Sequence, residues 1–267
     1  MEYKGFMGGF YKITEWIMRI SGSNLLWLLC SSPFLFFLLT KLLLLQSPGA
    51  PQENLTLWAM GILAPFTLFP ATAALFSVTR KWVMGEADLS IIKVYFKGYK
   101  ENYKQSMLGG IFYTLLIVIM YVDYTVYMTQ ISNMQIIGMI MLFLLFLLLL
   151  SLFNFFSLVA HYHLGAFQLI KNAILFTIIR PFRTLSTLIC VVVLGFLTMR
   201  FTWLILFGFG SLAALVAFYN FYVAYNKIQE KVEKMREAEE ESNGINLSKT
   251  DDDLELNLPA GEDKEKD

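Results

Sequence analysis

The chain has 267 residues, of which 57% are hydrophobic and 24 are Phe, and its formal net charge is zero. A water-soluble protein must cover its exterior with polar groups, so this composition excludes an ordinary soluble globular fold. The neutral total hides a division, because residues 1–229 carry a formal charge of +8 and residues 230–267 carry −8. Neither part gives a reason to expect nucleic-acid binding.

Six apolar stretches follow one another along the chain. They lie near residues 23–45, 57–79, 107–128, 134–160, 185–199 and 201–222. About 20 apolar residues cross a hydrocarbon core of about 30 Å, so each stretch is a candidate transmembrane helix, although the fifth is short. The first 21 residues lack the apolar centre of a cleaved signal peptide, so we expect the first stretch to remain as an anchor.

Lysine and arginine fall on alternate sides of these stretches. The first, third, fifth and seventh of the regions outside them hold 3, 6, 3 and 7 basic residues, which is 19 of the 21 in the chain. Short loops rich in Lys and Arg stay on the cytoplasmic side of a membrane. The pattern therefore predicts a multi-pass protein of the cell membrane with six spans and with both termini in the cytoplasm.

A basic or aromatic segment precedes each pair of spans, namely Tyr3–Ile20, Leu89–Lys104 and Leu164–Arg183. This threefold pattern predicts three transmembrane hairpins, each preceded by a cytoplasmic interfacial helix. We do not expect residues 164–179 to form a seventh span. Such a span would place Lys171 at mid-membrane, at a cost of roughly 2.5–3.5 kcal/mol, and would invert every later loop.

The middle segment has the clearest pattern. Leu89, Ile92, Phe96, Tyr99 and Tyr103 recur at spacings of three and four and form one stripe of a helix. Lys93, Lys97, Lys100 and Lys104, called the lysine row below, form an adjacent stripe. One interpretation is a membrane-surface helix whose rings sit among headgroups and whose lysines contact anionic lipid or a partner. The other is that the rings pack on the protein itself and the lysines only set the topology.

Asn154 and Asn220 are the polar side chains that we expect deep within the spans. An asparagine in hydrocarbon needs a hydrogen-bond partner, which a neighbouring helix usually supplies. Pro65 and Pro70 are the expected helix disturbances in the second span, because each lacks an N–H and frees a carbonyl four residues earlier. The freed groups could line a cavity, or the helix could simply pack with a kink.

Asp123 lies among Tyr121, Tyr124 and Tyr127 at the predicted outer end of the third span. An acidic group there must reach water or a basic partner, for which Lys41 and Arg200 are the candidates. A solvated carboxylate within a belt of interfacial tyrosines is the simpler interpretation.

The residues that usually carry catalysis or bind metal are sparse. His161 and His163 are the only histidines, and a spacing of two residues points their rings to different sides of a helix. No nucleophile motif, metal cluster or pair of acids accompanies them. We therefore expect no enzymatic activity, no metal and no cofactor.

The C-terminal region beyond the sixth span begins as a charged helix. Glu230 and Lys234 have the spacing of a helical ion pair, and so do Arg236 and Glu240. From Ser242 onward the apolar residues become few and acidic residues dominate. The composition predicts a cytoplasmic helix that leads into a disordered acidic tail.

Several short motifs resemble the YesL family of bacterial integral membrane proteins. The motifs are Phe69–Trp82 (FPATAALFSVTRKW), Gly85-Glu86, Phe96–Ser106 (FKGYKENYKQS) and Arg180–Leu185 (RPFRTL). The resemblance covers most of the chain up to about Lys227. It implies a protein of unknown function from Gram-positive bacteria, often encoded beside sugar-binding transporters and polysaccharide-degrading enzymes, and it brings no catalytic residues.

Two functions remain open on these grounds. The resemblance favours an accessory or regulatory partner of a carbohydrate-uptake transporter or of a sensor kinase. The alternative is a small-solute carrier or channel, whose mark would be a polar path joining Asn154, Asn220 and the kinked second span. No Asp or Glu lies in the middle of a predicted span, which argues against ion-coupled transport.

Overall fold

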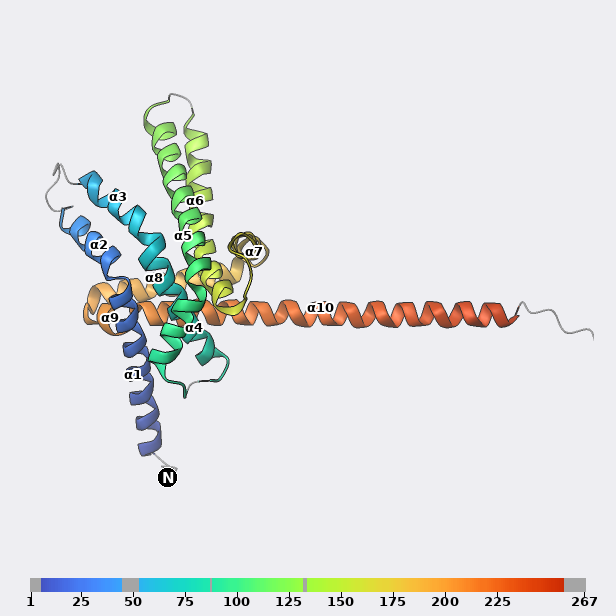
Figure 1. Ribbon diagram of the computed structural model, residues 1–267. Coiled ribbons are helices and arrows are strands. Elements are labelled where there is room, and N and C mark those ends of the chain that lie inside the picture. The colour runs from blue at the N-terminus through green and yellow to red at the C-terminus, as the bar shows by residue number, and fades with distance from the viewer. Residues whose placement is uncertain (1–5, 45–52, 87, 132–133, 257–267) are drawn as a thin grey trace, which may run out of the picture. The chain divides into compact units, whose positions relative to one another are not determined.

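The computed structural model describes residues 6–44, 53–86, 88–131 and 134–256 (Figure 1). These residues are helical and contain no strand. The elements are α1 (Phe6–Cys30), α2 (Ser32–Leu44), α3 (Glu53–Leu63), the π-helical turn η1 (Ala64–Leu68), α4 (Phe69–Val83), α5 (Ile91–Thr129), α6 (Gln135–His161), α7 (Ala166–Ile179), α8 (Pro181–Arg200), α9 (Trp203–Phe207) and α10 (Phe209–Leu256). The chain divides into two units at Tyr222 and Val223.

Four of the described helical segments are long and apolar enough to cross a membrane. They are Leu55–Val83, Ile91–Thr129, Gln135–His161 and Pro181–Arg200. A fifth candidate is the pair Tyr11–Cys30 and Ser32–Leu44, whose two helices are bent by 81°. The all-helical, membrane-type character that the sequence predicts is therefore confirmed with four or five candidate spans, while six spans in three hairpins stay a prediction.

The predicted first span, 23–45, is not one helix. It begins inside α1, which ends at Cys30, and it continues in α2 after the bend. Pro33 lies at the start of α2, where its missing N–H is tolerated, whereas the same ring within a continuous helix would clash with the carbonyl of Leu29. The expected helix at Tyr3–Ile20 is likewise no separate element, because α1 runs from Phe6 without a break; residues 3–5 lie outside the described part.

The predicted sixth span, 201–222, is also interrupted. Residues Trp203–Phe207 form the short helix α9, and α10 begins only at Phe209. The backbone leaves helical geometry at Gly208, with φ −166° and ψ −20°. A break at this depth requires partners for the freed backbone groups.

The lysine row belongs to the same helix as the third span. α5 has 39 residues, so it is about 58 Å long at a rise of about 1.5 Å per residue, well beyond a hydrocarbon core of about 30 Å. The segment between Tyr99 and Met107 contains neither proline nor glycine, the usual causes of a sharp kink. The prediction of a separate surface-lying helix at 89–104 is therefore wrong, because a continuous helix cannot cross the membrane and also lie flat on it.

The third predicted interfacial segment does form a separate helix. α7 has 14 residues and a length of about 21 Å, which is shorter than the hydrocarbon core. Lys171 on this helix is exposed. These features agree with the expectation that residues 164–179 do not form a seventh span.

The core of the first unit is built around α4, which packs against α1, α5 and α6. Ala71, Ala73 and Ala74 are fully buried, and so is the ring of Tyr95 from α5. Small side chains on α4 allow the backbones of α4 and α5 to approach closely, as in other membrane helix pairs. At the closest point, a Cβ added to Gly98 would lie 2.6 Å from Cβ of Ser77.

The second unit consists of Val223–Asp267 and is described up to Leu256 as part of α10. Residues 242–256 are helical, so the prediction that disorder begins at Ser242 is wrong for them. Extending an existing helix by one residue costs much less than nucleating a new one, so weak helix formers can follow the charged segment. The last part of the predicted tail, 257–267, lies outside the described residues.

Candidate functional site

The two asparagines predicted to lie deep in the spans are both buried and hydrogen-bonded to threonines. Asn154 on α6 donates through Nδ2 to Oγ1 of Thr177 on α7, at 2.8 Å, and to Oγ1 of Thr184 on α8, at 3.2 Å. Asn220 on α10 donates to Oγ1 of Thr187 on α8, at 3.1 Å. Both side chains therefore join helices within the first unit.

The second span accommodates its two prolines through the π-helical turn η1, which contains Pro65 and ends directly before Phe69-Pro70. A π turn is a frequent way to absorb a disrupted ladder of helical hydrogen bonds. The Phe66 carbonyl that Pro70 frees accepts a hydrogen bond from the Tyr103 hydroxyl, at 3.4 Å. A groove of about 330 Å³ lies beside the turn and is lined mainly by apolar side chains, among them Trp58, Ile62 and Leu115.

The structure does not bring the candidate intramembrane polar groups into one path. Neither Asn154 nor Asn220 lines the groove beside Pro65. Their amides are instead engaged by threonines at interfaces between α6, α7, α8 and α10. The polar path that was expected for a carrier or channel is therefore not observed among the described residues.

Asn24 is a buried polar centre that sequence reasoning missed. Its Nδ2 donates to the carbonyls of Ile205 and Leu206, at 2.8 and 2.7 Å, and its Oδ1 accepts from the N–H groups of Gly210 and Ser211, at 2.9 and 3.2 Å. One side chain on α1 thus satisfies the end of α9 and the start of α10. Asn24 follows Ser21-Gly22-Ser23, a polar run that the sequence placed at a span boundary.

Ser23 and Trp27 extend this polar centre along the same helix. The hydroxyls of Ser23 and Ser211 are 2.7 Å apart, and the indole N–H of Trp27 donates to Thr72 Oγ1 at 3.1 Å. An apolar groove of about 370 Å³ adjoins the break between α9 and α10 and includes Trp27, Thr72 and Gly210 in its lining. The interrupted helix is thus tied to α1, and α1 is in turn tied to α4.

All four lysines of the lysine row are exposed on α5. Of the accompanying rings, Phe96 is exposed, whereas Tyr99 and Tyr103 are half-buried. The buried face of α5 instead carries Tyr95, Gly98 and Asn102, which pack on α4. The lysine row therefore points away from the core, and among the described side chains only Lys97 of this row approaches an acidic group, Glu101, at 3.9 Å.

Asp123 is half-buried on α5 and forms no ion pair with Lys41 or Arg200 among the described side chains. The two histidines differ in burial, and only His161 belongs to α6, which ends there. His161 at the end of α6 is half-buried against the rings of Phe218 and Phe221, whereas His163 is exposed. The described residues include no group of three or more metal-ligating side chains.

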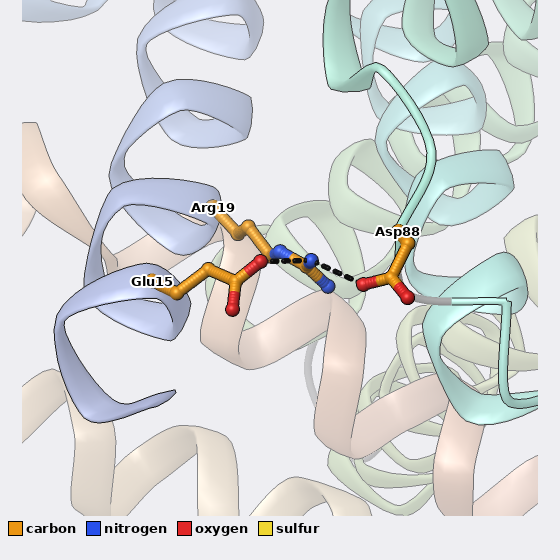
Figure 2. Close-up of polar contacts among 3 residues, drawn as sticks. All are labelled: Glu15, Arg19 and Asp88. Atoms are coloured by element: carbon orange, nitrogen blue, oxygen red, sulfur yellow. Dashed lines mark hydrogen bonds and ion pairs between the residues drawn. The ribbon is translucent and has the colours of Figure 1, made fainter. Parts of the chain in front are cut away.

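A second feature that the sequence did not indicate links α1 to the loop between α4 and α5. Figure 2 shows the Arg19 guanidinium between the carboxylates of Glu15 and Asp88, and Nη2 donates to Asp88 Oδ1 at 2.8 Å. The same guanidinium lies over the Trp16 ring, 5.8 Å from its centroid, and Trp16 meets Trp82 edge-on. Arg19 thus links α1 to the loop between α4 and α5.

A polar cleft of about 470 Å³ lies where α4 ends and α5 begins. Its lining comes from α4, the following loop and the first turns of α5, and is completed by Ala160 of α6 and by His163. Ser77 and Asn102 form its polar floor, with Asn102 Nδ2 donating to Ser77 Oγ at 3.0 Å. Arg80 and Lys81 come from the last turn of α4. Among the cavities described above, this one has the most polar lining.

Comparison with known proteins agrees with the motifs in the first half of the chain. The family described as "Protein of unknown function, DUF624" matches residues 20–124. No solved structure matches the chain. The family match includes the motifs at 69–82 and 96–106 and ends before Arg180–Leu185, so the resemblance of that later motif stays a prediction.

Three curated proteins of Bacillus subtilis (strain 168) are similar to parts of the chain. Uncharacterized protein YteU is 35% identical over 46% of this chain and 43% of its own length. Uncharacterized protein YesL is 25% identical over 44% and 43%, and uncharacterized protein YesV is 31% identical over 48% and 65%. In these matches the chain spans about half the length of its relatives. The resemblance to the YesL family that the sequence predicts is therefore confirmed over the first half of the chain, which is similar to YesL and to the family of unknown function that matches residues 20–124.

Proposed function

We propose that this protein is an accessory or regulatory membrane protein that binds a carbohydrate-uptake transporter or a sensor kinase through the lysine row of α5. The observation that supports the proposal is the two-sided character of α5 between Ile91 and Ser106. One face packs tightly on α4, whereas the lysines on the other side are exposed and Lys93, Lys100 and Lys104 have no ion pair among the described side chains. The choice of partner rests on the family resemblance.

The length of α5 favours a protein partner over lipid alone. If Met107 marks the edge of the hydrocarbon and the helix follows the membrane normal, Lys104 stands about 5 Å and Lys93 about 21 Å beyond that edge. The headgroup region is only about 5–8 Å thick on each side. Lys104 therefore contacts anionic lipid at the cytoplasmic face, while Lys93 and Lys97 reach past it toward a partner.

The carrier or channel remains the second candidate because the helices are discontinuous. The bend between α1 and α2, the turn η1 and the break at Gly208 resemble the interrupted helices that line binding sites in transporters. The grooves beside η1 and beside Gly208 are mainly apolar, so an apolar or amphipathic solute would suit them better than an ion. Flux through vesicles containing the pure protein would favour this alternative. We propose no reaction chemistry for either candidate.

The proposal includes six spans in the cell membrane with both termini in the cytoplasm, since this orientation places the lysine row inside. Reporter fusions at Leu89 and Lys249 are expected to give cytoplasmic signals, and fusions at Asn54 and Ser132 external ones, because of the positive-inside bias. Paired reporters of opposite compartment preference, fused at each position, make the measurement. A cytoplasmic signal at Asn54 or Ser132 would refute the six-span arrangement.

Replacing Lys93, Lys97, Lys100 and Lys104 together by Gln is expected to weaken partner binding by about tenfold to thirtyfold at low salt. Exposed ion pairs contribute about 0.2–1 kcal/mol each, and added salt screens them. The measurement is the amount of a stoichiometric partner that co-purifies with the protein from native membranes across a salt series.

The matched control for that variant replaces Lys227, Lys231, Lys234 and Arg236 by Gln, which removes four exposed positive charges from the second unit. The control is expected to keep the partner. Topology is checked in both variants, because the lysine row also contributes to the positive-inside bias. Equal retention of the partner by both variants would remove the lysine row from the proposed contact.

A further inference from the structure

The polar cleft beside the last turn of α4 is lined by more positively charged than negatively charged side chains. Three cationic side chains line it, Arg80, Lys81 and Lys97. Lys81 is paired with Glu86, at 2.7 Å, and Lys97 approaches Glu101, at 3.9 Å. Both acidic groups of the lining are thus used by the lysines, and the charge of Arg80 remains.

Arg80 has unmet hydrogen-bonding capacity as well as unbalanced charge. Its Nε is buried from solvent and has no hydrogen-bond partner, and no carboxylate among the described side chains forms an ion pair with it. A guanidinium offers five donors in a planar fork, which matches the oxygens of phosphate or carboxylate groups. Half-burial lowers the local dielectric and so strengthens the attraction for an anion that enters.

The floor of the cleft adds neutral donors beside this charge. Asn102 is 7% exposed, and it uses one N–H of its amide on Ser77, which leaves the second for a ligand. The exposed imidazole of His163 stands at the rim. Arg80 and Asn102 thus both offer N–H donors to an acceptor in the cleft, and a hydrogen bond from a guanidinium to a phosphate is charge-assisted and therefore strong.

We propose that this cleft binds a phosphoryl anion, held by the guanidinium of Arg80 and the amide of Asn102. The anion is either the headgroup of an anionic phospholipid or a small soluble phosphate compound. The lining combines Arg80, at the end of the candidate span Leu55–Val83, with Lys97, which the proposed function places beyond the lipid headgroups. Both a lipid phosphate and a soluble compound can therefore reach the cleft. The volume of about 470 Å³ accommodates either group.

The test uses the full-length protein in detergent and two probes, inorganic phosphate and phosphatidic acid, with phosphatidylcholine as the neutral lipid. Phosphate binding is followed by calorimetry and lipid retention by native mass spectrometry. Arg80→Gln is compared with Lys227→Gln, which removes the same charge from an exposed residue that does not line the cleft. We expect Arg80→Gln to lose at least about tenfold in affinity, because a charged hydrogen bond is removed, and Lys227→Gln to stay within about threefold.

The two probes separate the sources of the anion. Binding of inorganic phosphate that depends on Arg80 assigns a soluble ligand, whereas Arg80-dependent retention of phosphatidic acid alone assigns a lipid. Equal behaviour of the Arg80→Gln and Lys227→Gln variants, or binding of neither probe by the unaltered protein, would overturn the proposal.

A conservative variant covers the case in which Arg80→Gln does not fold. Arg80→Lys keeps the charge but lacks the planar fork, so a weaker affinity supports the site and an unchanged affinity overturns it. No partner is present in these measurements. The result is therefore independent of whether the lysine row binds a transporter or a kinase.

Discussion

Replacing Asn24 by Ala is expected to lower the free energy of unfolding by about 4 kcal/mol. The substitution leaves two carbonyls and two N–H groups at the break between α9 and α10 without their partner. Each buried backbone group that loses its hydrogen bond costs about 1–3 kcal/mol, and neighbouring helices can recover part of this loss. Denaturant unfolding in detergent, followed by circular dichroism, measures the change.

Asn172→Ala is the matched control for Asn24→Ala. Asn172 lies half-buried on α7, and no hydrogen bond of its side chain is seen among the described residues. The same atoms are therefore removed without loss of a partner, and we expect a change within about 0.5 kcal/mol. Similar losses for both substitutions would show that Asn24 does not hold the interrupted helix.

Replacing Gly110 by Leu is expected to destabilise the protein by about 3 kcal/mol, near the upper end of the range for overpacked cores. A Cβ at this position would lie 2.8 Å from Cα of Pro65 and 2.8 Å from Cγ of Phe69. The first of these atoms belongs to the backbone of η1, so relief requires the second span to move away from α5. Thermal unfolding in detergent measures the loss.

Gly195→Leu provides the opposite expectation. Gly195 is in the interior of α8, and no heavy atom lies within 4 Å of its added Cβ. Leucine is the better helix former by nearly 1 kcal/mol, so this variant is expected to be as stable as the parent or slightly more so. A Gly110→Leu protein as stable as the Gly195→Leu protein would contradict the close packing of η1 on α5.

The sequence predicted several local features correctly because they depend on neighbouring residues. The apolar runs at 107–128 and 134–160 correspond to parts of α5, the longest of the four unbroken candidates, and of α6, the most apolar of them. The expectation that Asn154 and Asn220 would bond to neighbouring helices is confirmed by their threonine partners. An amide that is buried in the membrane needs a hydrogen-bond partner, whichever residue supplies it.

The predictions from the sequence were wrong at the ends of helices. One error separated from a span a segment that belongs to the same helix, and another missed a break that a distant residue stabilises. The lysine row was placed on its own helix because its composition differs from that of the span, yet no kink-forming residue separates the two. The break at Gly208 was missed because the residue that stabilises it, Asn24, precedes Ile205 by 181 positions. A pattern within a window of 20 residues carries no information about such a pair.

The sequence by itself determined the membrane type, the helical class and the resemblance to YesL proteins. It also determined which regions outside the spans are basic. Each of these features follows from composition, short motifs and short-range periodicity. Only the tertiary structure decided that Asn24 holds an interrupted helix. It also decided that Arg19 ties α1 to Asp88 and that Nε of Arg80, in the lining of a polar cleft, has no hydrogen-bond partner. These features depend on which distant side chains meet, and contacts across more than 60 positions are set by packing of the whole bundle.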